Sequence, residues 1–262
     1  MTTISKYSAS GNDFVIFHAF DKKDRSQLAI ELCNRQEGIG ADGLIVLVPH
    51  KSLDFEWEFY NSDGSYAAMC GNGSRACAHY AYKMNLAPKN MKFLTGAGEI
   101  SASIVPSKGT EAIEGNSNHR DMVLSELTPP DIQNREIVHN NKSWWLIDTG
   151  VPHLITFDAD INNFDIEEAR ELRYKYNCNV NIASIINDST IKVRTYERGV
   201  ENETLACGTG MASAYYRALQ ENLVKKETLV LPKSDEKLYL GFENGTITFK
   251  GLVKATFTTT WN

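Results

Sequence analysis

The tetrapeptide Cys-Gly-x-Gly occurs twice in this 262-residue chain, and the two copies lie about half a chain length apart. The first is Cys70-Gly71-Asn72-Gly73 and the second is Cys207-Gly208-Thr209-Gly210. Each copy follows an extended segment that ends in an aromatic residue and a polar turn, and each leads into a helical run of small residues. This shared context predicts a fold of two similar halves, each with one Cys-Gly-x-Gly turn at the start of a helix.

Strand patterns outnumber helix patterns along the chain. In residues 54–60, Phe55, Trp57 and Phe59 alternate with acidic residues, which is the period-two pattern of a half-buried strand. Short runs rich in β-branched and aromatic residues predict further strands at 13–20, 43–49, 143–149, 179–186, 190–196, 228–232, 237–242, 246–251 and 252–260. Helices are expected at about 25–36, 73–85, 165–176 and 209–222.

A polar segment at residues 106–120 contains two glycines and lacks periodicity. Such a composition favours an interdomain link or an exposed hairpin. We therefore expect an N-terminal half over 1–116, joined by the last strand at about 252–262. The C-terminal half is expected over 117–251.

Composition excludes several classes of protein. The net charge is −6 and evenly spread, so the chain lacks the basic footprint of a nucleic-acid binder. No apolar run approaches the ~20 residues of a membrane span, and the N-terminus has no signal-peptide pattern. Five cysteines, an odd number, are typical of reduced thiols rather than of a disulfide scaffold. We expect a cytoplasmic protein that binds neither membrane nor nucleic acid.

Two other motifs are given structural interpretations. Residues 38–43 spell the dinucleotide-binding pattern Gly-x-Gly-x-x-Gly, but a helix pattern precedes them and a strand pattern follows, which reverses the required order. We interpret them as a helix C-cap. Cys70, Cys77 and His79 match no common zinc spacing, so no metal site is expected, and Cys77 is interpreted as a buried thiol.

Cys70 and Cys207 are different, because each directly precedes a glycine at a helix entrance. Unsatisfied amides and the positive end of the helix dipole favour the thiolate form there. The glycines also let backbone amides approach an anion closely. If the halves pack about a pseudo-twofold axis, the two thiols face each other across a shared cleft. The alternative, small buried residues at tight turns, explains one cysteine better than a repeated pair.

Two opposed thiols suit the inversion of a carbon centre. One thiolate removes a proton, and the opposite thiol returns a proton to the other face, while helix N-termini stabilise the developing charge. A dry, preorganised site needs no cofactor for this reaction, so the pattern predicts racemisation or epimerisation of an amino acid. Arg198, next to Glu197, can clamp a carboxylate, and His153 can tune or relay the proton of one thiol. Each is individually compatible with a surface ion pair or a core histidine.

Motif blocks spread over almost the whole chain resemble the diaminopimelate epimerase family. Met-Cys-Gly-Asn-Gly together with Leu-Ala-Cys-Gly-Thr-Gly is specific: proline racemases and hydroxyproline epimerases typically have other residues at these turns, and PhzF-like isomerases lack the paired cysteines. The matching blocks are 8–17, 38–45, 61–78, 152–155, 179–182 and 196–214.

The resemblance implies cofactor-independent interconversion of LL- and meso-2,6-diaminopimelate on the bacterial route to lysine and peptidoglycan precursors. It implies an α/β (α+β) fold of two pseudo-symmetric halves, each a mixed curled sheet around a central helix, with the active site in the cleft between them. Cys70 and Cys207 match the catalytic acid/base cysteines, supported by Glu197 and His153. Substrate contacts are implied for Asn12, Asn61, Gly71, Asn72, Asn179, Glu197, Arg198, Gly208 and Thr209. Family members are often homodimers, so a homodimer is compatible with this resemblance.

Three departures from the family pattern concern the distal end of the substrate and leave the two-thiol chemistry intact. Val151 stands where an asparagine is common, and Gly43 where some members have glutamine. The segment 197–204 is one residue longer than usual, with Asn202 in place of a glycine, and asparagine accepts a positive φ better than most residues.

Two alternatives remain open at this point. One is a racemase or epimerase of the same fold that acts on another amino acid, which the change at Val151 makes conceivable. The other is an amino-acid-binding or redox-sensing protein in which Cys70 and Cys207 form a disulfide. This second alternative leaves Glu197, Arg198 and His153 without an evident task.

Overall fold

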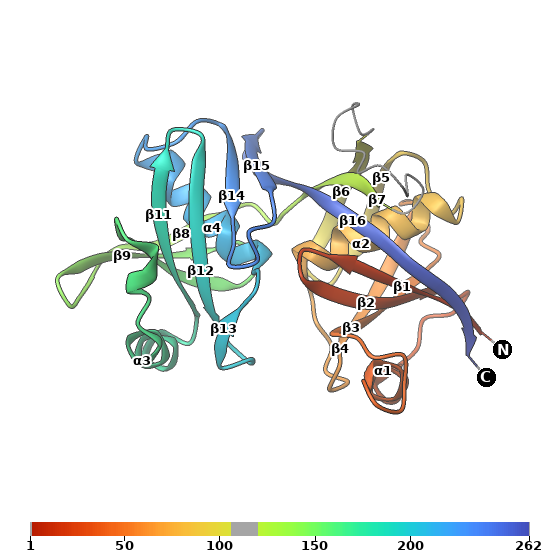
Figure 1. Cartoon of the computed structure of the whole chain (residues 1–262). Helices are drawn as coiled ribbons and strands as arrows, with labels where there is room; N and C mark the ends of the chain where they lie inside the picture. The colour runs from red at the N-terminus through yellow and green to blue at the C-terminus, as the bar shows by residue number, and fades with distance from the viewer. Residues whose placement is uncertain (1, 106–119, 262) are drawn as a thin grey trace. The chain divides into compact units, whose positions relative to one another are not determined.

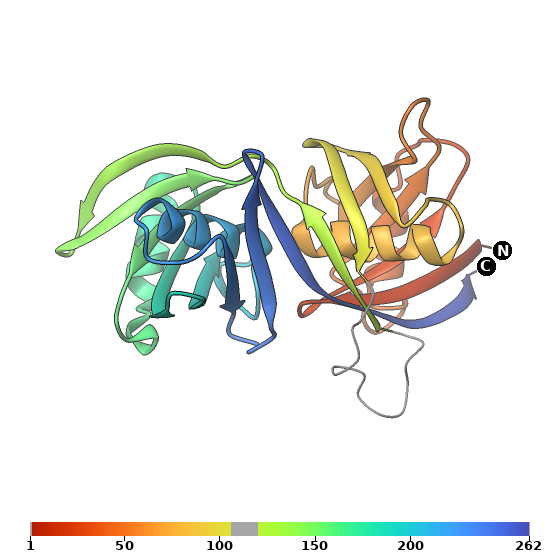
Figure 2. The same ribbon diagram turned by 90° about the horizontal axis from the view of Figure 1, so that it is seen from above.

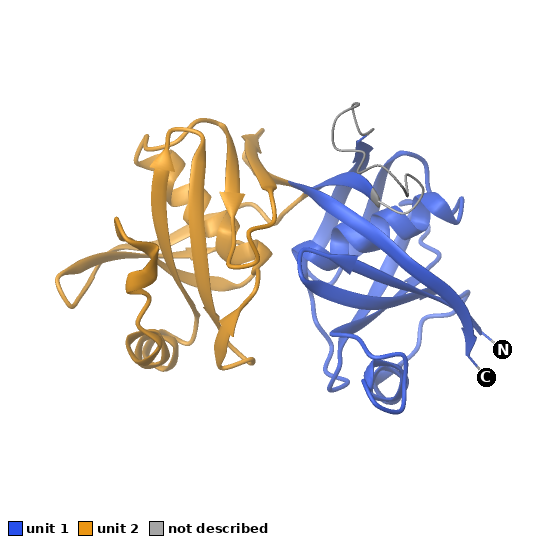
Figure 3. Ribbon diagram, viewed as in Figure 1, with its two compact units in different colours: residues 1–125, 250–262 blue, residues 126–249 orange. Residues whose placement is uncertain are grey.

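The computed structural model describes residues 2–105 and 120–261 (Figure 1). The predicted boundary at 116/117 and nearly all of the predicted link at 106–120 lie outside the described residues. The chain divides into two compact units (Figure 3). Unit 1 comprises Met1–Ser125 and Lys250–Asn262, and unit 2 comprises Glu126–Phe249.

Unit 1 is a sheet curled around one helix. Seven strands lie side by side in sequence order, and the last strand of the chain, β16 (Thr246–Trp261), pairs with both β7 and β1 and so closes the sheet (Figure 1). Helix α2 (Gly71–Lys83) is enclosed, and its buried face packs on side chains from the surrounding strands. The seven strands are β1 (Thr2–Ala9), β2 (Asn12–His18), β3 (Gly43–Val48), β4 (Phe55–Asn61), β5 (Asn90–Thr95), β6 (Gly98–Val105) and β7 (Arg120–Glu126).

A second helix, α1 (Ser26–Cys33), covers the opposite face of the same sheet. Strands β2 and β3 are therefore apolar on both faces, with Val15 and Val46 toward α1 and Ile16 and Ile45 toward α2. This double coverage explains why their sequences are continuous apolar runs.

Unit 2 has strands of the same kind, which are seen from above in Figure 2 and belong to the same hydrogen-bonded sheet through β16. Helix α4 (Gly208–Gln220) packs against β10, β11, β12 and β14, and α3 (Ile166–Tyr176) lies between β10 and β11 in sequence. A short 3-10 helix covers Ile161–Asn163. The strands are β8 (Asp131–His139), β9 (Lys142–Asp148), β10 (Pro152–Phe157), β11 (Asn179–Asn187), β12 (Thr190–Glu197), β13 (Asn202–Thr204), β14 (Glu227–Leu231) and β15 (Leu238–Glu243), and the start of β16 completes the sheet.

The strand pairings repeat between the units. From β1 to β6 the successive pairs are antiparallel, parallel, antiparallel, parallel and antiparallel. The pairs β9–β10, β10–β11, β11–β12, β12–β14 and β14–β15 follow the same pattern. In both units a helix crosses over at each parallel pair, so the repeat predicted from the two Cys-Gly-x-Gly turns is present in the topology.

The C-cap residue of α1 is Asn34, so residues 38–43 follow the cap rather than form it, although their amides bond to carbonyls of the last helical turn. The amides of Ile39 and Gly40 both donate to the carbonyl of Leu32, at 2.9 and 3.0 Å, and Ala41 donates to Cys33. Gly40 has a φ of +75°, which glycine adopts without strain. Strand β3 follows, so the segment opens no helix.

Two expectations about strands were wrong in detail. The strand at 54–60 buries Phe55, Trp57 and Phe59, but Glu58 is buried as well, because Arg25 at the start of α1 pairs with its carboxylate. The predicted strands at 246–251 and 252–260 are one continuous strand, β16. Among the described helices, none is long and apolar enough to cross a membrane.

Candidate active site

Cys70 is the N-cap residue of α2 in unit 1, as the Cys-Gly-x-Gly turn predicts. Its backbone is extended, and its Sγ accepts a hydrogen bond from the Gly73 amide at 3.3 Å. The Ser74 amide donates to the Cys70 carbonyl at 2.8 Å. Gly71 and Asn72 thus supply first-turn amides that no acceptor within the helix can reach. A thiol in this position lies at the positive end of the helix dipole.

Asn12 and Asn72 belong to a chain of hydrogen bonds beside Cys70. Asp42 Oδ2 accepts from Asn12 Nδ2 at 3.1 Å, and Asn12 Oδ1 accepts from Asn72 Nδ2 at 2.7 Å. Asn72 Oδ1 in turn accepts from the guanidinium of Arg75 at 2.9 Å. Because a carboxylate only accepts and a guanidinium only donates, the orientation of both amides is fixed.

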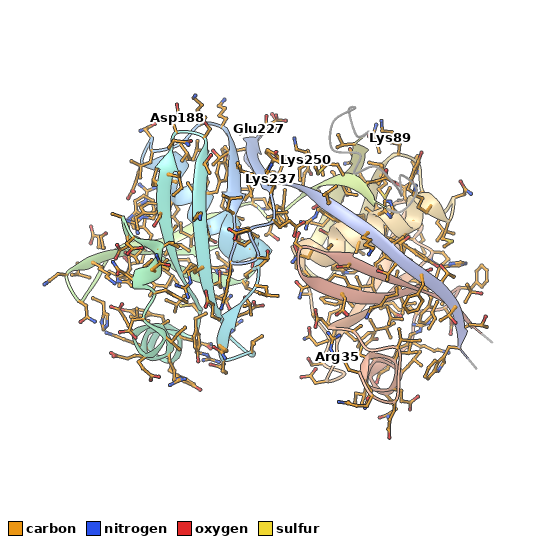
Figure 4. All side chains as sticks on the ribbon, viewed as in Figure 1. Arg35, Lys89, Asp188, Glu227, Lys237 and Lys250 are labelled. Atoms are coloured by element: carbon orange, nitrogen blue, oxygen red, sulfur yellow. The ribbon has the colours of Figure 1, made fainter. Side chains whose placement is uncertain are left out.

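The carboxylate end of this chain is anchored by cations. Arg35, labelled in Figure 4, donates to Asp13 and Asp42, with both Nη2–O distances at 2.9 Å. Lys6 also pairs with Asp13, at 2.7 Å. Burial alone would raise the pKa of Asp13, but the hydrogen bonds from Arg35 and Lys6 lower it to about 2.

Asn61 is the last residue of β4 and lies at the same end of the unit 1 strands as Asn12. It pairs with Gly43, which in turn pairs with Phe14 two residues after Asn12. Its Nδ2 donates to Ser65 Oγ at 2.9 Å, so the turn after β4 holds this side chain.

Cys207 is the N-cap residue of α4 in unit 2, which repeats the position of Cys70. Its Sγ lies 3.6 Å from Thr209 Oγ1, within hydrogen-bonding reach of sulfur. A Cβ on Gly210 would collide with Asn181 Oδ1 and lie 3.0 Å from Thr195 Oγ1. Glycine here therefore lets the start of α4 press against β11 and β12.

His153 is the second residue of β10, and its side chain is fully buried. Its Nε2 lies 2.9 Å from Thr209 Oγ1, and its Nδ1 lies 3.1 Å from Asn181 Nδ2. Burial, followed by the positive charge of Arg198, lowers the pKa of His153 to about 3. The imidazole is therefore neutral at physiological pH.

Glu197 ends strand β12 and is followed by Arg198, and Asn179 begins the neighbouring strand β11. Thr204 Oγ1 donates to Glu197 Oε2 at 2.8 Å, and the Arg198 amide donates to Asn179 Oδ1 at 2.8 Å. The Arg198 guanidinium donates to the carbonyl of Asn177 at 2.8 Å.

Among the non-glycine residues of this hairpin, the positive φ falls on Glu201 and not on Asn202. Asn202 is the first residue of β13 and pairs with Glu197, while Glu201 has the left-handed conformation, with φ +56°. The Glu201 carboxylate accepts from the Gly199 amide at 3.0 Å and from Arg173, and the Tyr196 hydroxyl donates to its carbonyl. These bonds hold the hairpin between β12 and β13.

The remaining thiols are buried, as predicted. Burial raises the pKa of Cys33 and Cys178 to about 12 and that of Cys77 well above its usual range. His79 is also buried and bonds to Asp121 at 2.8 Å rather than to a cysteine. Residues 2–105 and 120–261 hold no group of three or more His, Cys, Asp or Glu side chains that could bind a metal ion.

Several polar residues around the predicted ones were not singled out from the sequence: the half-buried Asp42 and the buried Arg75, Asn181 and Thr195. Asn181 carried a usable signal. It lies two residues after Asn179 in a strand, so both side chains point to the same face of the sheet.

Solved structures define the class of fold. The chain superposes on a probable proline racemase from Agrobacterium radiobacter K84, solved with bound carbonate, with a TM-score of 0.74 at 12% identity over 100% of this chain and 93% of that chain. A PhzF-family phenazine biosynthesis protein from Bacillus anthracis gives a TM-score of 0.71 at 13% identity over 98% of both chains. The protein therefore has the mixed α/β fold shared by proline racemases and PhzF proteins.

Sequence comparison defines the family within this fold. The family model for diaminopimelate epimerase matches residues 4–119 and 145–246. The diaminopimelate epimerase of a Nitratiruptor species is 59% identical over 254 residues, covering 97% of this chain and 96% of that protein. Those of Campylobacter jejuni (49% over 257 residues, 98% of each) and Helicobacter pylori (47% over 253 residues, 95% and 93%) are also similar. The chain belongs to the diaminopimelate epimerase family.

Proposed function

We propose that this protein interconverts LL- and meso-2,6-diaminopimelate by a two-base mechanism in which Cys70 and Cys207 exchange the roles of base and acid. Family membership makes the protein an isomerase, a diaminopimelate epimerase of lysine biosynthesis. The observation that carries the two-cysteine mechanism is that each thiol is the N-cap residue of a buried helix, at the same point of the repeated topology. We extend the proposal to the supply of peptidoglycan precursors and to a cytoplasmic location.

In the proposed mechanism the two units are pseudo-symmetric halves that hold the substrate in the cleft between them. One thiolate removes the α-proton, and the opposite thiol donates a proton to the other face of the same carbon. One C–H bond breaks and one forms, so no redox partner is needed. The developing negative charge spreads onto the adjacent carboxylate, which the first-turn amides of Gly71, Asn72, Gly208 and Thr209 stabilise.

The remaining predicted residues orient the substrate. Asn12 and Asn72 present amides whose orientation is fixed by Asp42 and Arg75. Asn61, Asn179 and Arg198 contribute polar groups at the corresponding strand ends of the two units. Glu197 and His153 support proton transfer at the two thiols. Such preorganisation lowers the reorganisation that the site undergoes during reaction.

Solvent-exchange mass spectrometry tests the reaction directly. LL-diaminopimelate incubated with the reduced enzyme in D2O is expected to gain deuterium at one α-carbon as meso product appears. Exchange into proline, hydroxyproline or glutamate instead would assign another substrate. Ligand binding with no exchange into any amino acid would favour a binding or redox-sensing protein.

The cysteine variants test the mechanism. Cys70→Ala and Cys207→Ala are each expected to lower turnover at least ~10²-fold, because a general acid or base contributes about 10²–10⁴-fold. Cys77→Ala is the matched control: this thiol is buried in α2 and is expected to affect stability alone. Near wild-type turnover in either of the first two variants would contradict the two-base mechanism.

A further inference from the structure

Asn181 is a fully buried polar residue next to the unit 2 half of the proposed site, and the mechanism above gives it no task. It lies on β11 beside His153, and its main contacts are with groups that are themselves buried. A buried amide with every polar atom engaged constrains its neighbours, since each misplaced hydrogen bond in the interior is costly.

The orientation of the Asn181 amide is fixed by two neighbours. Its Nδ2 lies 3.2 Å from the carbonyl oxygen of Leu154, which can only accept. Its Oδ1 accepts from the Thr195 hydroxyl at 2.8 Å. The amide nitrogen is therefore the atom that faces His153 Nδ1, at 3.1 Å, and it donates there.

This contact determines which nitrogen of His153 carries the hydrogen. Nδ1 accepts from Asn181, so a neutral ring has its hydrogen on Nε2. The acceptor within reach of Nε2 is Thr209 Oγ1, at 2.9 Å, whereas the nearby Asn179 offers its amide nitrogen at 3.4 Å. The Asn179 oxygen is already bonded to the Arg198 amide. The Nε2 hydrogen therefore points to Thr209.

The Thr209 hydroxyl, having accepted from His153, keeps its own hydrogen for another acceptor. Cys207 Sγ lies 3.6 Å away. We propose that Asn181 is a positioning residue that holds neutral His153 in the Nε2–H tautomer, so that the Thr209 hydroxyl donates to the Cys207 sulfur and stabilises its thiolate. The inference rests on the proposed function, since it assigns the thiolate of Cys207 a role in the reaction.

In this chain of hydrogen bonds, Asn181 donates to Leu154 and to His153, His153 donates to Thr209, and Thr209 donates to Cys207. Thr209→Ser keeps the last donor and Thr209→Val removes it at nearly the same volume. A hydrogen bond to a charged group contributes enough to change the thiolate fraction about tenfold or more. His153 acts on Cys207 through Thr209 in this arrangement, and its own charge does not change.

The tautomer is measured by ¹⁵N–¹H correlation NMR of histidine-labelled protein. The wild type is expected to show Nε2–H for His153 across neutral pH. Asn181→Asp places an acceptor at Nδ1 and is expected to move the hydrogen there or to protonate the ring. Asn187→Asp, at the exposed end of the same strand, is the control and is expected to leave the tautomer unchanged. An Nδ1–H tautomer in the wild type, or an unchanged tautomer in Asn181→Asp, would overturn the assignment.

Alkylation of Cys207 by iodoacetamide, followed on its peptide by mass spectrometry, gives a second test that does not need Asn181→Asp to fold. At neutral pH, Thr209→Ser is expected to react at the wild-type rate and Thr209→Val about tenfold more slowly. Equal rates for wild type and Thr209→Val refute the inference. Deuterium exchange into LL-diaminopimelate by the wild type in D2O tests the proposed function separately from this inference. Absence of exchange there contradicts the proposed function, whereas the tautomer and alkylation results decide this inference.

Discussion

Buried amides in both units have a single usable orientation, because a group that only accepts or only donates stands at a fixed place in each hydrogen-bond chain. In unit 1 the fixed groups are Asp42 and Arg75, and in unit 2 the fixed group is the carbonyl of Leu154. The buried amides of Asn72 and Asn181 cannot rotate without leaving a polar atom unsatisfied, which costs about 1–3 kcal/mol. The side chains of the proposed site are thus oriented before substrate arrives.

The lowered pKa of His153 predicts how the free energy of unfolding depends on pH. It is about 3 in the folded chain against an ordinary 6.5, so between these pH values the unfolded chain binds a proton that the folded chain does not. The free energy of unfolding must therefore fall as the pH is lowered from about 6.5 toward 3. His153→Gln is expected to reduce this slope by up to about 1.4 kcal/mol per pH unit, measured by urea unfolding.

The wild type and His153→Gln also provide a control at higher pH. Above pH 7.5 neither folded nor unfolded His153 carries a proton, so the two pH slopes should coincide there. Equal slopes between pH 4 and 6 would show that His153 titrates normally in the folded protein.

At residue scale, the sequence predicts the two thiols and the amides beside them better than the groups that orient those amides. Cys70 and Cys207 stand in a recognisable local pattern, and their N-cap positions are as expected. Asp42 and Asn181 act through partners far away in sequence, such as the Asn181–His153 contact across two strands. No local pattern encodes such a contact.

At the scale of elements, α2 and α4 begin in the same way but are packed differently. An added Cβ on Gly73 would meet Cys70 Cβ and Ile45 Cδ1 at 3.3 Å, contacts that small shifts relieve. The equivalent Cβ on Gly210 would collide with the immobile amide of Asn181. The start of α4 therefore tolerates less added volume than the start of α2.

Gly210→Ala is expected to destabilise the protein by about 1–3 kcal/mol and to lower turnover about tenfold or more, because it separates the start of α4 from Asn181 and His153. Gly73→Ala is the matched comparison, and its loss in both measurements should be smaller. Thermal unfolding and initial rates of epimerisation measure the two effects. A larger loss in Gly73→Ala would contradict this packing difference.

Element prediction succeeded where the pattern was local. Helices α1 to α4 and the apolar strands β2, β3 and β11 lie close to their predicted ranges. Strands β1, β5, β6, β7, β8, β10 and β13 were not predicted individually. β1 and β8 carry many polar residues, and β1 is held by pairing with β16 at the other end of the chain. Tertiary contacts decide the structure of such segments.

At the scale of the whole molecule, the last strand completes the fold of the first unit. β16 pairs with β1 from Thr2 to Ala9 and also lies beside β7, and its Val253 is fully buried in the core around α2. Without it, β1 and β7 would both present open edges, and exposed edges favour aggregation.

Deletion of residues 250–262 is therefore expected to unfold unit 1 while leaving much of unit 2 folded. Hydrogen exchange followed by mass spectrometry should show loss of protection in β1 and α2 and retained protection in α4. Retained protection in α2 would show that the sheet around it is stable without closure by β16.

The pairing of Thr2 with Trp261 also has a consequence for how a cell makes this protein. Domains usually fold in the order in which they leave the ribosome. Here unit 1 cannot close its sheet until β16 has been translated, although unit 2 comes before residue 250 in the chain. Unit 2 can therefore be complete first, while the strands of unit 1 that were translated before it keep an open edge until β16 has left the ribosome.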